Sequence, residues 1–260
     1  MGLGVALWLC PKRNTQIYDK INTLQCSLNT LFPDQPPRFE PHITITTNII
    51  IDLDDPQITR DDVDRILSAS VVAIRSLPKN HENLIKLSNI DSQRKLFKKL
   101  YFQVLRDPNL ISFARIIREL FVIIPSDIEK ENQKQNPHLY TQDVNGVTIK
   151  RKPSKKHKHK EEQLPIKKFD TSHIEAAAAY KAAEWSQQEY DPHLSLVYSN
   201  LWPIDNALWR TIKTRISDNL NVESCDDIIN TGLGWDGGVL KLVLCEGDVN
   251  EWVTLGSVDI

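Results

Sequence analysis

The sequence has few cysteines, and it places them far apart. The four cysteines occupy positions 10, 26, 225 and 245, and no two of them form a C-x-x-C pair. This spacing excludes the usual zinc and redox motifs. We therefore expect free, mostly buried thiols in a reducing compartment, in preference to disulfide bonds.

Long apolar runs and an excess of one charge are missing as well. No stretch approaches the apolar length of a membrane span. The run LGVALWLC, residues 3–10, is short and has no basic residue before it, which argues against a signal peptide and favours a buried strand. The net charge of −2 provides no long-range attraction to polyanions, so any contact with nucleic acid must be local.

The remaining composition is that of an ordinary globular protein. The chain has 260 residues, of which 40% are hydrophobic and 25% charged, and this length is enough to bury a substantial core. It fits one large domain or two modest ones. We predict a single domain over residues 1–260, interrupted by one insertion.

Apolar residues recur along the chain with both the period of a strand and the period of a helix. The predicted strands cover residues 3–10, 43–50, 83–91, 99–107, 189–201, 239–247 and 253–260. The predicted helices run from a cap at Asn14 to Leu31, and over residues 61–74, 108–121, 173–185 and 205–216. This order lacks the regular βαβ alternation of a doubly wound fold, and short links between neighbouring strands suit antiparallel pairing. An α+β architecture with two small sheets, each backed by helices, follows.

Residues 125–170 differ from the rest of the chain. They contain few apolar residues and a basic run, KRKPSKKHKHK, at residues 150–160. We interpret this segment as a polar, basic insertion that is partly disordered. Within it, Asn145 and Gly146 stand between short β-prone pieces and predict a small hairpin.

Two of the seven histidines stand in nearly the same local sequence. The stretches E-P-H-I-T-I and D-P-H-L-S-L begin at residues 40 and 191. Because side chains alternate along a strand, His42 and Thr44 are expected on one face and their apolar neighbours on the other, and the same holds for His193 and Ser195. Each predicted strand therefore offers an imidazole and a hydroxyl on one side.

Such a doubled pattern is rare by chance. A hydroxyl two residues after a histidine, with apolar residues in the flanking places, occurs at roughly one histidine in a hundred, so two among seven is on the order of a per-mille event. The other five histidines do not match even the H-x-[ST] core. The doubling favours a functional role for both histidines over two polar residues that strands merely tolerate.

The doubled H-x-[ST]-x pattern, with about 150 residues between its copies, resembles the motif pair of the 2H phosphoesterase superfamily. The length, the opening strand with ALWL and the second motif HLSLVY are most similar to the fungal and plant 2′,3′-cyclic nucleotide phosphodiesterases. The resemblance covers most of the chain apart from residues 125–170. It implies a bilobal α+β fold in which two pseudo-symmetric antiparallel sheets, flanked by helices, carry the motifs on opposite sides of a central groove.

The resemblance also implies an activity. It is the metal-independent hydrolysis of 2′,3′-cyclic nucleotides to nucleoside 2′-phosphates, and of ADP-ribose 1″,2″-cyclic phosphate, a by-product of tRNA splicing, to ADP-ribose 1″-phosphate. No metal or other cofactor is expected.

The residue types of the two motifs suit this chemistry. Opening a cyclic phosphate needs a base for water, an acid for the leaving oxygen and donors for the non-bridging oxygens. Histidine serves as base or acid near neutral pH, and Thr44 and Ser195 would donate hydrogen bonds to the phosphate. The sequence leaves the assignment of base and acid open; we favour His193 as the base and His42 as the acid.

Two aromatic residues are further candidates for the substrate groove. In the resembled family a tyrosine stands five residues after the second histidine, which is Tyr198 here, and an aromatic of the first strand, Trp8 here, stacks on a base. Alternation along the strand places Tyr198 on the face opposite His193, unless the strand ends or bulges near it. For both residues a simple packing role is the alternative.

The basic run is a weaker signal. It could contact RNA, since short lysine and arginine clusters gain from the release of counterions, or act as a nuclear address, but most such runs are solvated loops. His157 and His159 lie within it and are poor metal ligands beside so much positive charge. We therefore retain a possible RNA contact as an expectation and expect no metal site.

Two other functions are also compatible with the sequence. One alternative is an RNA-end processing enzyme of the same superfamily, either a 2′–5′ ligase or a 3′-end exonuclease, which would use the basic run to hold a longer chain. Another is a non-catalytic nucleotide-binding or RNA-binding module, against which both intact histidine–hydroxyl pairs argue. We expect a monomer in an intracellular compartment, either cytoplasmic or, as for some fungal relatives, Golgi-associated.

Overall fold

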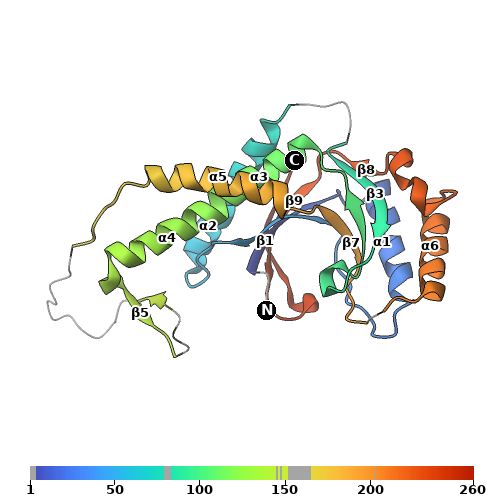
Figure 1. Cartoon of the computed structure of the whole chain (residues 1–260), viewed down its shortest axis with the longest axis horizontal. Helices are drawn as coiled ribbons and strands as arrows, with labels where there is room; N and C mark the ends of the chain where they lie inside the picture. The colour runs from blue at the N-terminus through green and yellow to red at the C-terminus, as the bar shows by residue number, and fades with distance from the viewer. Residues whose placement is uncertain (1–3, 79–82, 145, 147, 152–164, 202) are drawn as a thin grey trace.

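The computed structural model describes residues 4–78, 83–144, 146, 148–151, 165–201 and 203–260. The strands are β1 (Gly4–Cys10), β2 (Ile43–Ile49), β3 (Ile85–Asp91), β4 (Leu100–Val104), β5 (Tyr140–Gln142), β6 (Thr148–Lys150), β7 (His193–Val197), β8 (Gly234–Trp235), β9 (Val239–Cys245) and β10 (Val253–Asp259). The helices are α1 (Gln16–Asn29), α2 (Pro56–Arg75), α3 (Pro108–Arg118), α4 (Ile124–Gln135), α5 (Ser172–Gln188) and α6 (Asn206–Leu220). Figure 1 shows their arrangement around a curled sheet. The predicted α+β class is confirmed.

The main sheet has eight antiparallel strands in the order β10-β9-β1-β2-β7-β4-β3-β8. The two predicted sheets are its halves, with β10, β9, β1 and β2 in one and β7, β4, β3 and β8 in the other. At the centre the halves are joined by one registered residue pair, Ile43 with Leu194. The two predicted sheets therefore form one continuous sheet with a weakly paired seam.

The helices cover one face of this sheet and lock the two halves together. Helix α1 follows β1 in the chain but contacts β7 of the other half, and α3 follows β4 but contacts β2. Helix α2 packs against β9 and β10, while α6 packs against α1. Figure 1 shows α1 and α6 outside the curl of the sheet. Each half is thus held by a helix that the other half supplies.

Strand β1 shows why its sequence is apolar throughout. Val5, Leu7 and Leu9 point into the main core with the helices. Their alternating neighbours lie in a smaller cluster on the opposite face, with Val243 and Cys245 of β9. A strand that is buried on both faces needs apolar residues at every position, as the sequence of residues 4–10 has.

Two helices begin at residues other than those predicted. The cap of α1 is Thr15, whose hydroxyl accepts a hydrogen bond from the backbone N–H of Tyr18, and not Asn14. Helix α2 begins at Pro56 rather than residue 61, because the carboxylate of Asp55 caps it. The same aspartate–proline pair begins α3 as predicted, with Asp107 as the cap. Such caps satisfy the free N–H groups of the first turn.

The predicted end of a helix near Phe121 is wrong. Helix α3 continues through a π-helical turn, Glu119–Ile123, into α4, which ends at Gln135. The π turn ends at Ile123, two residues before Pro125, whose missing N–H would interrupt a regular α-helix. Residues 125–135, at the start of the predicted insertion, are therefore helical.

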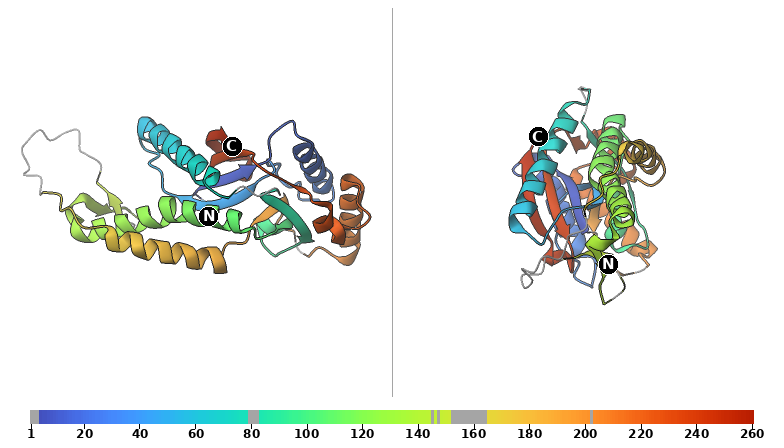
Figure 2. Two further views of the ribbon diagram at one scale, coloured as in Figure 1. Left: turned by 90° about the horizontal axis from the view of Figure 1, so that it is seen from above. Right: turned by 90° about the vertical axis from the view of Figure 1, so that its left-hand side faces the viewer.

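Helices α4 and α5 form an arm that projects from the sheet (Figures 1 and 2). Asp127 of α4 accepts hydrogen bonds from Lys130 at 3.2 Å and from Lys181 of α5 at 2.7 Å. The amide of Asn136 binds the backbone N–H and C=O of Lys167, in the segment before α5. Polar and ionic contacts thus support helical packing where the sequence has few apolar residues.

The predicted small hairpin is confirmed by its two strands, since β5 and β6 pair antiparallel with Thr141 opposite Ile149, while Asn145 lies outside the described residues. The greater part of the basic run lies outside the described residues, as do His157 and His159. The four cysteines are free, as predicted, and three of them are buried. Among the described helices, none has the length and apolar character needed to cross a membrane.

The turn before β9 gives a test of the fold. Gly238 has a φ of +124°, and a Cβ there would lie 2.3 Å from the carbonyl oxygen of Cys10 in β1. Gly232 is the matched control, with a φ of +66° and open space around its Cα. Urea denaturation should show that Gly238→Ala lowers the free energy of unfolding by about 2 kcal/mol more than Gly232→Ala. Equal losses in the two variants would contradict this packing.

Candidate active site

The two motif histidines are held in the same way. Nδ1 of His42 lies 2.6 Å from the carbonyl oxygen of Glu40, and Nδ1 of His193 lies 2.8 Å from that of Asp191. Since a carbonyl only accepts, each Nδ1 carries the hydrogen. This contact fixes the tautomer, and Nε2 is the nitrogen left for proton transfer on both rings.

The seam of the sheet brings the two motifs together. Ile43 and Leu194, which form the registered pair, are the middle residues of the two H-x-[ST] motifs. In an antiparallel register centred on them, His42 comes opposite Ser195 and Thr44 opposite His193. All four predicted motif residues thus gather at one place, with each histidine beside the hydroxyl of the other motif.

Burial makes both imidazoles hard to protonate. It lowers the pKa of His42 to about 4, although the hydrogen bond with Glu40 opposes the shift. Burial also lowers the pKa of His193 to about 4, and the positive charge of Lys98 adds to that effect. Both rings are therefore neutral at pH 7 in the free protein. A bound anion would restore one proton by favouring the charged form.

The two hydroxyls differ in their surroundings. Thr44 is half-buried on β2, whereas Ser195 is buried and donates a hydrogen bond of 2.7 Å to the carbonyl oxygen of Phe97. Gln25 of α1 donates to the carbonyl of Ser195 at 2.9 Å and so fixes the backbone of β7. Before Ser195 can donate to a phosphate, its hydroxyl must turn away from Phe97.

Trp8 lies in the site, but it packs on a catalytic candidate. Its ring stacks on that of His42 with 3.7 Å between centroids and an angle of 9° between planes. Only 6% of Trp8 is exposed. One face of the indole is thus occupied by His42, and stacking of Trp8 on a substrate base stays a prediction.

Tyr198 also lies beside the motifs. Strand β7 ends at Val197, so the strand alternation no longer governs Tyr198. Its ring stacks on Phe39 at 3.8 Å and meets the edge of Phe97 at 5.1 Å. The ring centroid of Trp252 lies 6.2 Å from that of Tyr198. Tyr198 is thus buried among aromatic rings near the site, and its contact with substrate stays a prediction.

Sequence reasoning missed several residues of this site. The lysines Lys98 and Lys241 pair with the acidic residues that begin the two motifs, and Tyr101 of β4 places its ring against the edge of His193, at 5.4 Å. The two acids were visible in the sequence, because both motifs begin with an acid followed by proline, but nothing near the motifs identifies the lysines.

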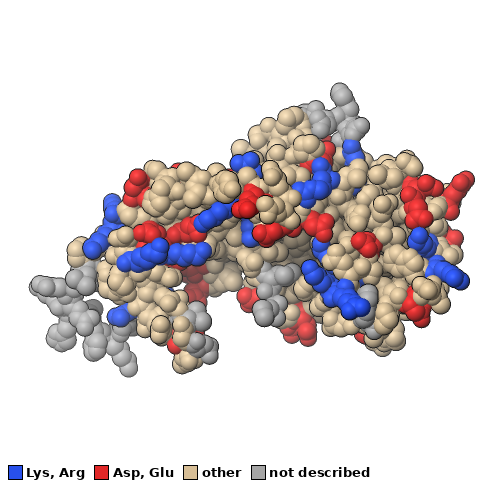
Figure 3. Space-filling model, viewed as in Figure 1, with Lys and Arg blue, Asp and Glu red and all other residues tan. Residues whose placement is uncertain are grey.

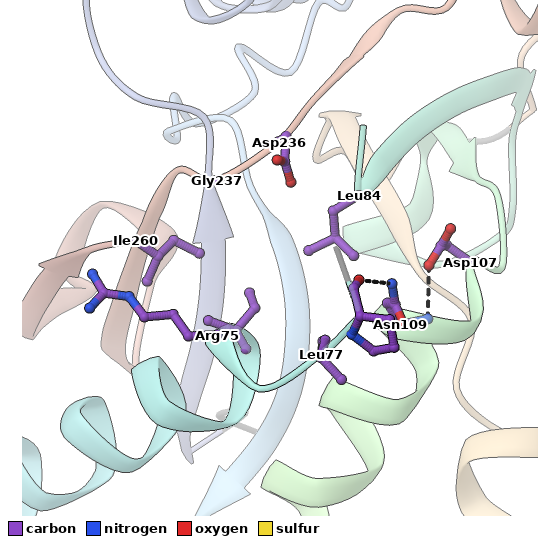
Figure 4. Close-up of a pocket in the computed structure, with 10 residues that line it drawn as sticks. Arg75, Leu77, Leu84, Asp107, Asn109, Asp236, Gly237 and Ile260 are labelled. Carbon is purple, nitrogen blue, oxygen red and sulfur yellow. Dashed lines mark hydrogen bonds between the residues drawn. The ribbon is translucent and has the colours of Figure 1, made fainter. Parts of the chain in front are cut away.

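A cavity of about 520 Å³ lies elsewhere, between the end of α2, the start of α3 and the turn before β9 (Figure 4). Two of its polar residues already have structural partners. Asp107 caps α3, and Asn109 donates to the carbonyl of Pro78 at 3.0 Å. Neither motif histidine lines this cavity. It therefore does not compete with the paired motifs as the candidate site.

The described residues do not form a metal-binding cluster. Within the described ranges, no group of three or more histidine, cysteine, aspartate or glutamate side chains gathers as a set of metal ligands. The chemistry that this part of the chain supports is proton transfer between two imidazoles and hydrogen bonding to an anion.

A family model described as cyclic phosphodiesterase-like protein matches residues 1–260. The chain belongs to this family. It is 69% identical over 258 residues to a protein of Candida albicans named 2′,3′-cyclic-nucleotide 3′-phosphodiesterase, across 99% of this chain and 100% of the relative. A protein of the same name from Debaryomyces hansenii is 63% identical over 240 residues, across 92% and 99% of the two chains. One from Saccharomyces cerevisiae is 25% identical over 296 residues, across 99% and 100%.

The membership confirms the resemblance inferred from the doubled motif. The match of the family model extends over the residues of α4 and the small sheet, which the resemblance had left out.

In this cyclic phosphodiesterase-like protein, both motif histidines should titrate far below an ordinary histidine. Burial disfavours the imidazolium, so we expect midpoints near pH 4 rather than near 6.5. The measurement is an NMR titration of the ring nitrogens, with His42→Gln and His193→Gln used to assign the signals. A midpoint near 6.5 for either ring in the free protein would show that the site is open to water.

Proposed function

We propose that this protein hydrolyses nucleoside 2′,3′-cyclic phosphates to nucleoside 2′-phosphates. The observation that carries the proposal is the meeting of two Nδ1-anchored histidines and two hydroxyls across one strand pair. The names of the Candida albicans and Debaryomyces hansenii relatives support it. The reaction is the transfer of a phosphoryl group to water without a protein-bound intermediate.

The proposed step uses the two Nε2 atoms in opposite roles. Nε2 of His193 takes a proton from water as the water oxygen bonds to phosphorus. The bond between phosphorus and O3′ breaks, and Nε2–H of protonated His42 gives its proton to O3′. Thr44 and Ser195 donate hydrogen bonds to the non-bridging oxygens and stabilise the charge that develops there. The product keeps its phosphate on O2′.

The surroundings of the two rings support this assignment. The charge of Lys98 lowers the pKa of His193 more than the charge of Asp191 raises it, which favours the neutral ring that a base requires. At His42 the charge of Glu40 raises the pKa more than the charge of Lys241 lowers it. His42 lies flat on Trp8, and an imidazolium in that position gains a cation–π interaction with the indole. The anionic phosphate would favour the same protonated form. These effects favour His193 as the base and His42 as the acid, although the same Nδ1–carbonyl contact holds both rings.

Several finer features belong to the same proposal. We propose ADP-ribose 1″,2″-cyclic phosphate, the tRNA splicing by-product, as a second substrate. It would be opened by the same groups to ADP-ribose 1″-phosphate, by a protein that acts as a monomer in the cytoplasm or at the Golgi. Trp8 and Tyr198 are proposed to line the substrate groove.

An RNA contact through the basic run is the least supported feature. On the described part of the arm, lysines alternate with acidic residues, as Figure 3 shows over α4 and α5. Lys150, at the start of the run, pairs with Glu129 at 3.7 Å. The superfamily alternatives of a ligase or a 3′-end exonuclease depend on this contact, so we place them behind the small-substrate reaction.

Removing either imidazole tests the reaction. We expect His42→Ala and His193→Ala each to lower kcat for adenosine 2′,3′-cyclic phosphate by about 10²–10⁴-fold, because each removes one proton transfer. The assay separates 2′- from 3′-phosphate products by HPLC, and Gly232→Ala serves as a folded control outside the site. Near-normal turnover in either histidine variant would refute the mechanism. A 3′-phosphate product would show that O2′, and not O3′, is the leaving oxygen.

A substrate with sulfur in place of O3′ separates acid from base. A thiolate leaves without protonation, so the acid becomes dispensable while the base does not. We expect the 3′-thio cyclic phosphate to restore at least about tenfold of the activity that His42→Ala loses, and to restore none in His193→Ala. Rescue of His193→Ala alone would exchange the two roles.

A further inference from the structure

The acid that begins each motif holds a lysine. Oε2 of Glu40 lies 2.5 Å from Nζ of Lys241, and Oδ2 of Asp191 lies 2.5 Å from Nζ of Lys98. The backbone carbonyls of the same two acids anchor the two histidines. Acid, histidine and lysine thus form a unit that occurs twice, once in each half of the sheet.

Both lysines belong to the side of the sheet that carries the site. Lys241 is the registered partner of Trp8, whose ring covers His42. Lys98 precedes β4, and its Nζ lies 5.5 Å from the ring centre of Tyr101, which is in T-shaped contact with His193. Their side chains are only 14% and 17% exposed. Each ammonium is therefore held close to one histidine and partly withdrawn from water.

The negative charge of Glu40 alone does not explain why Lys241 lies at the His42 end of the site. There Arg13 already bonds Oε1 of Glu40, at 3.0 Å, while Lys241 bonds the other oxygen. Burial raises the pKa of Glu40, but these two partners outweigh it and hold that pKa below its ordinary value. Two cations share one carboxylate, so this end of the site has a surplus positive charge.

Each lysine also keeps capacity for a ligand. An ammonium has three N–H donors, and the carboxylate takes one of them. A cyclic phosphate diester carries one negative charge, shared by two non-bridging oxygens, and a lysine is a strong point-charge partner for such a group. Two half-buried ammonium groups near the two imidazoles match that charge.

We propose that Lys98 and Lys241 bind the phosphate end of the substrate, each held in place by the acid that also anchors its histidine. The proposal rests on the proposed function, because it takes the two motifs to be the reactive centre. In this arrangement Glu40 and Asp191 are positioning residues, whose carbonyls aim the imidazoles and whose carboxylates aim the ammonium groups.

The same arrangement connects the lysines to the protonation of the histidines. Around His193 the charged or titratable groups are Lys98, Asp191, Tyr101 and His42. The charge of Lys98 lowers the pKa of that ring more than the charge of Asp191 raises it. Around His42 they are Glu40, Lys241 and His193, and the charge of Lys241 lowers the pKa of the ring. Removing a lysine should therefore raise the pKa of its own histidine.

The test removes each charge while keeping most of the side-chain volume. We expect Lys98→Met and Lys241→Met each to raise KM for adenosine 2′,3′-cyclic phosphate about tenfold, with kcat changed less than about threefold, because an anion contact is lost. Arginine at either position should restore most of the affinity. The effect on KM should shrink between 50 mM and 500 mM salt, since salt screens the contact.

Lys213→Met is the matched control, because Lys213 forms a comparable pair with Asp226 at 3.0 Å, on the surface between α6 and the segment after it. It should leave KM unchanged. In Lys98→Met the acidic limb of kcat/KM should move to higher pH, which a purely structural role would not produce. Unchanged KM in both site variants, or an equal rise in Lys213→Met, would overturn the proposal.

A binding measurement separates this proposal from the proposed function. Inorganic phosphate should shift the ring NMR signals of His42 and His193 in the wild type, at concentrations about tenfold lower than in either methionine variant. Phosphate binding that depends on the lysines, in a protein that does not turn over cyclic nucleotides, would uphold the lysine site and reject the reaction. Turnover of cyclic nucleotides together with phosphate binding that does not depend on the lysines would uphold the reaction and reject the lysine site.

Discussion

The site depends on one pairing, that of Ile43 with Leu194. This single registered pair joins the two halves of the sheet, and both of its residues are the middle members of the histidine motifs. A shift of one residue in either strand would turn its histidine and hydroxyl toward the helices. The burial of both apolar residues, each 0% exposed, opposes such a shift, because it would bring polar side chains into the core.

So short a seam needs support from outside the sheet. Helix α1 reaches from the first half to β7, where Gln25 holds the carbonyl of Ser195, and α3 reaches from the second half to β2. Only Ile43 and Leu194 pair in register between β2 and β7, and the aromatic rings of Phe39 and Tyr198 pack beside the motifs. The two halves can thus approach closely at the motifs without a full strand ladder between them.

The strands and the shared face of each histidine and its hydroxyl could be predicted from the sequence, because strand propensity and side-chain alternation are local properties. The lysines were not predictable in this way. Lys241 is 201 residues from Glu40, and Lys98 is 93 residues from Asp191, so only the folded sheet brings them together. Helix α4 escaped prediction for a different reason, since its polar sequence lacks an apolar stripe and it is held by α5 and by ion pairs.

A repeated motif by itself would give two equal histidines, whereas cleavage of a phosphate ester needs an acid and a base. Both rings share the carbonyl anchor and the burial that lowers their pKa values. Their difference comes from their surroundings, namely the indole that stacks on His42 and the charge of Lys98, which outweighs that of Asp191 at His193, whereas Lys241 does not outweigh Glu40 at His42. Pairs of titratable groups acquire opposite roles when their surroundings differ in this way. The internal symmetry therefore accounts for the geometry of the site, and the departures from symmetry account for its proposed chemistry.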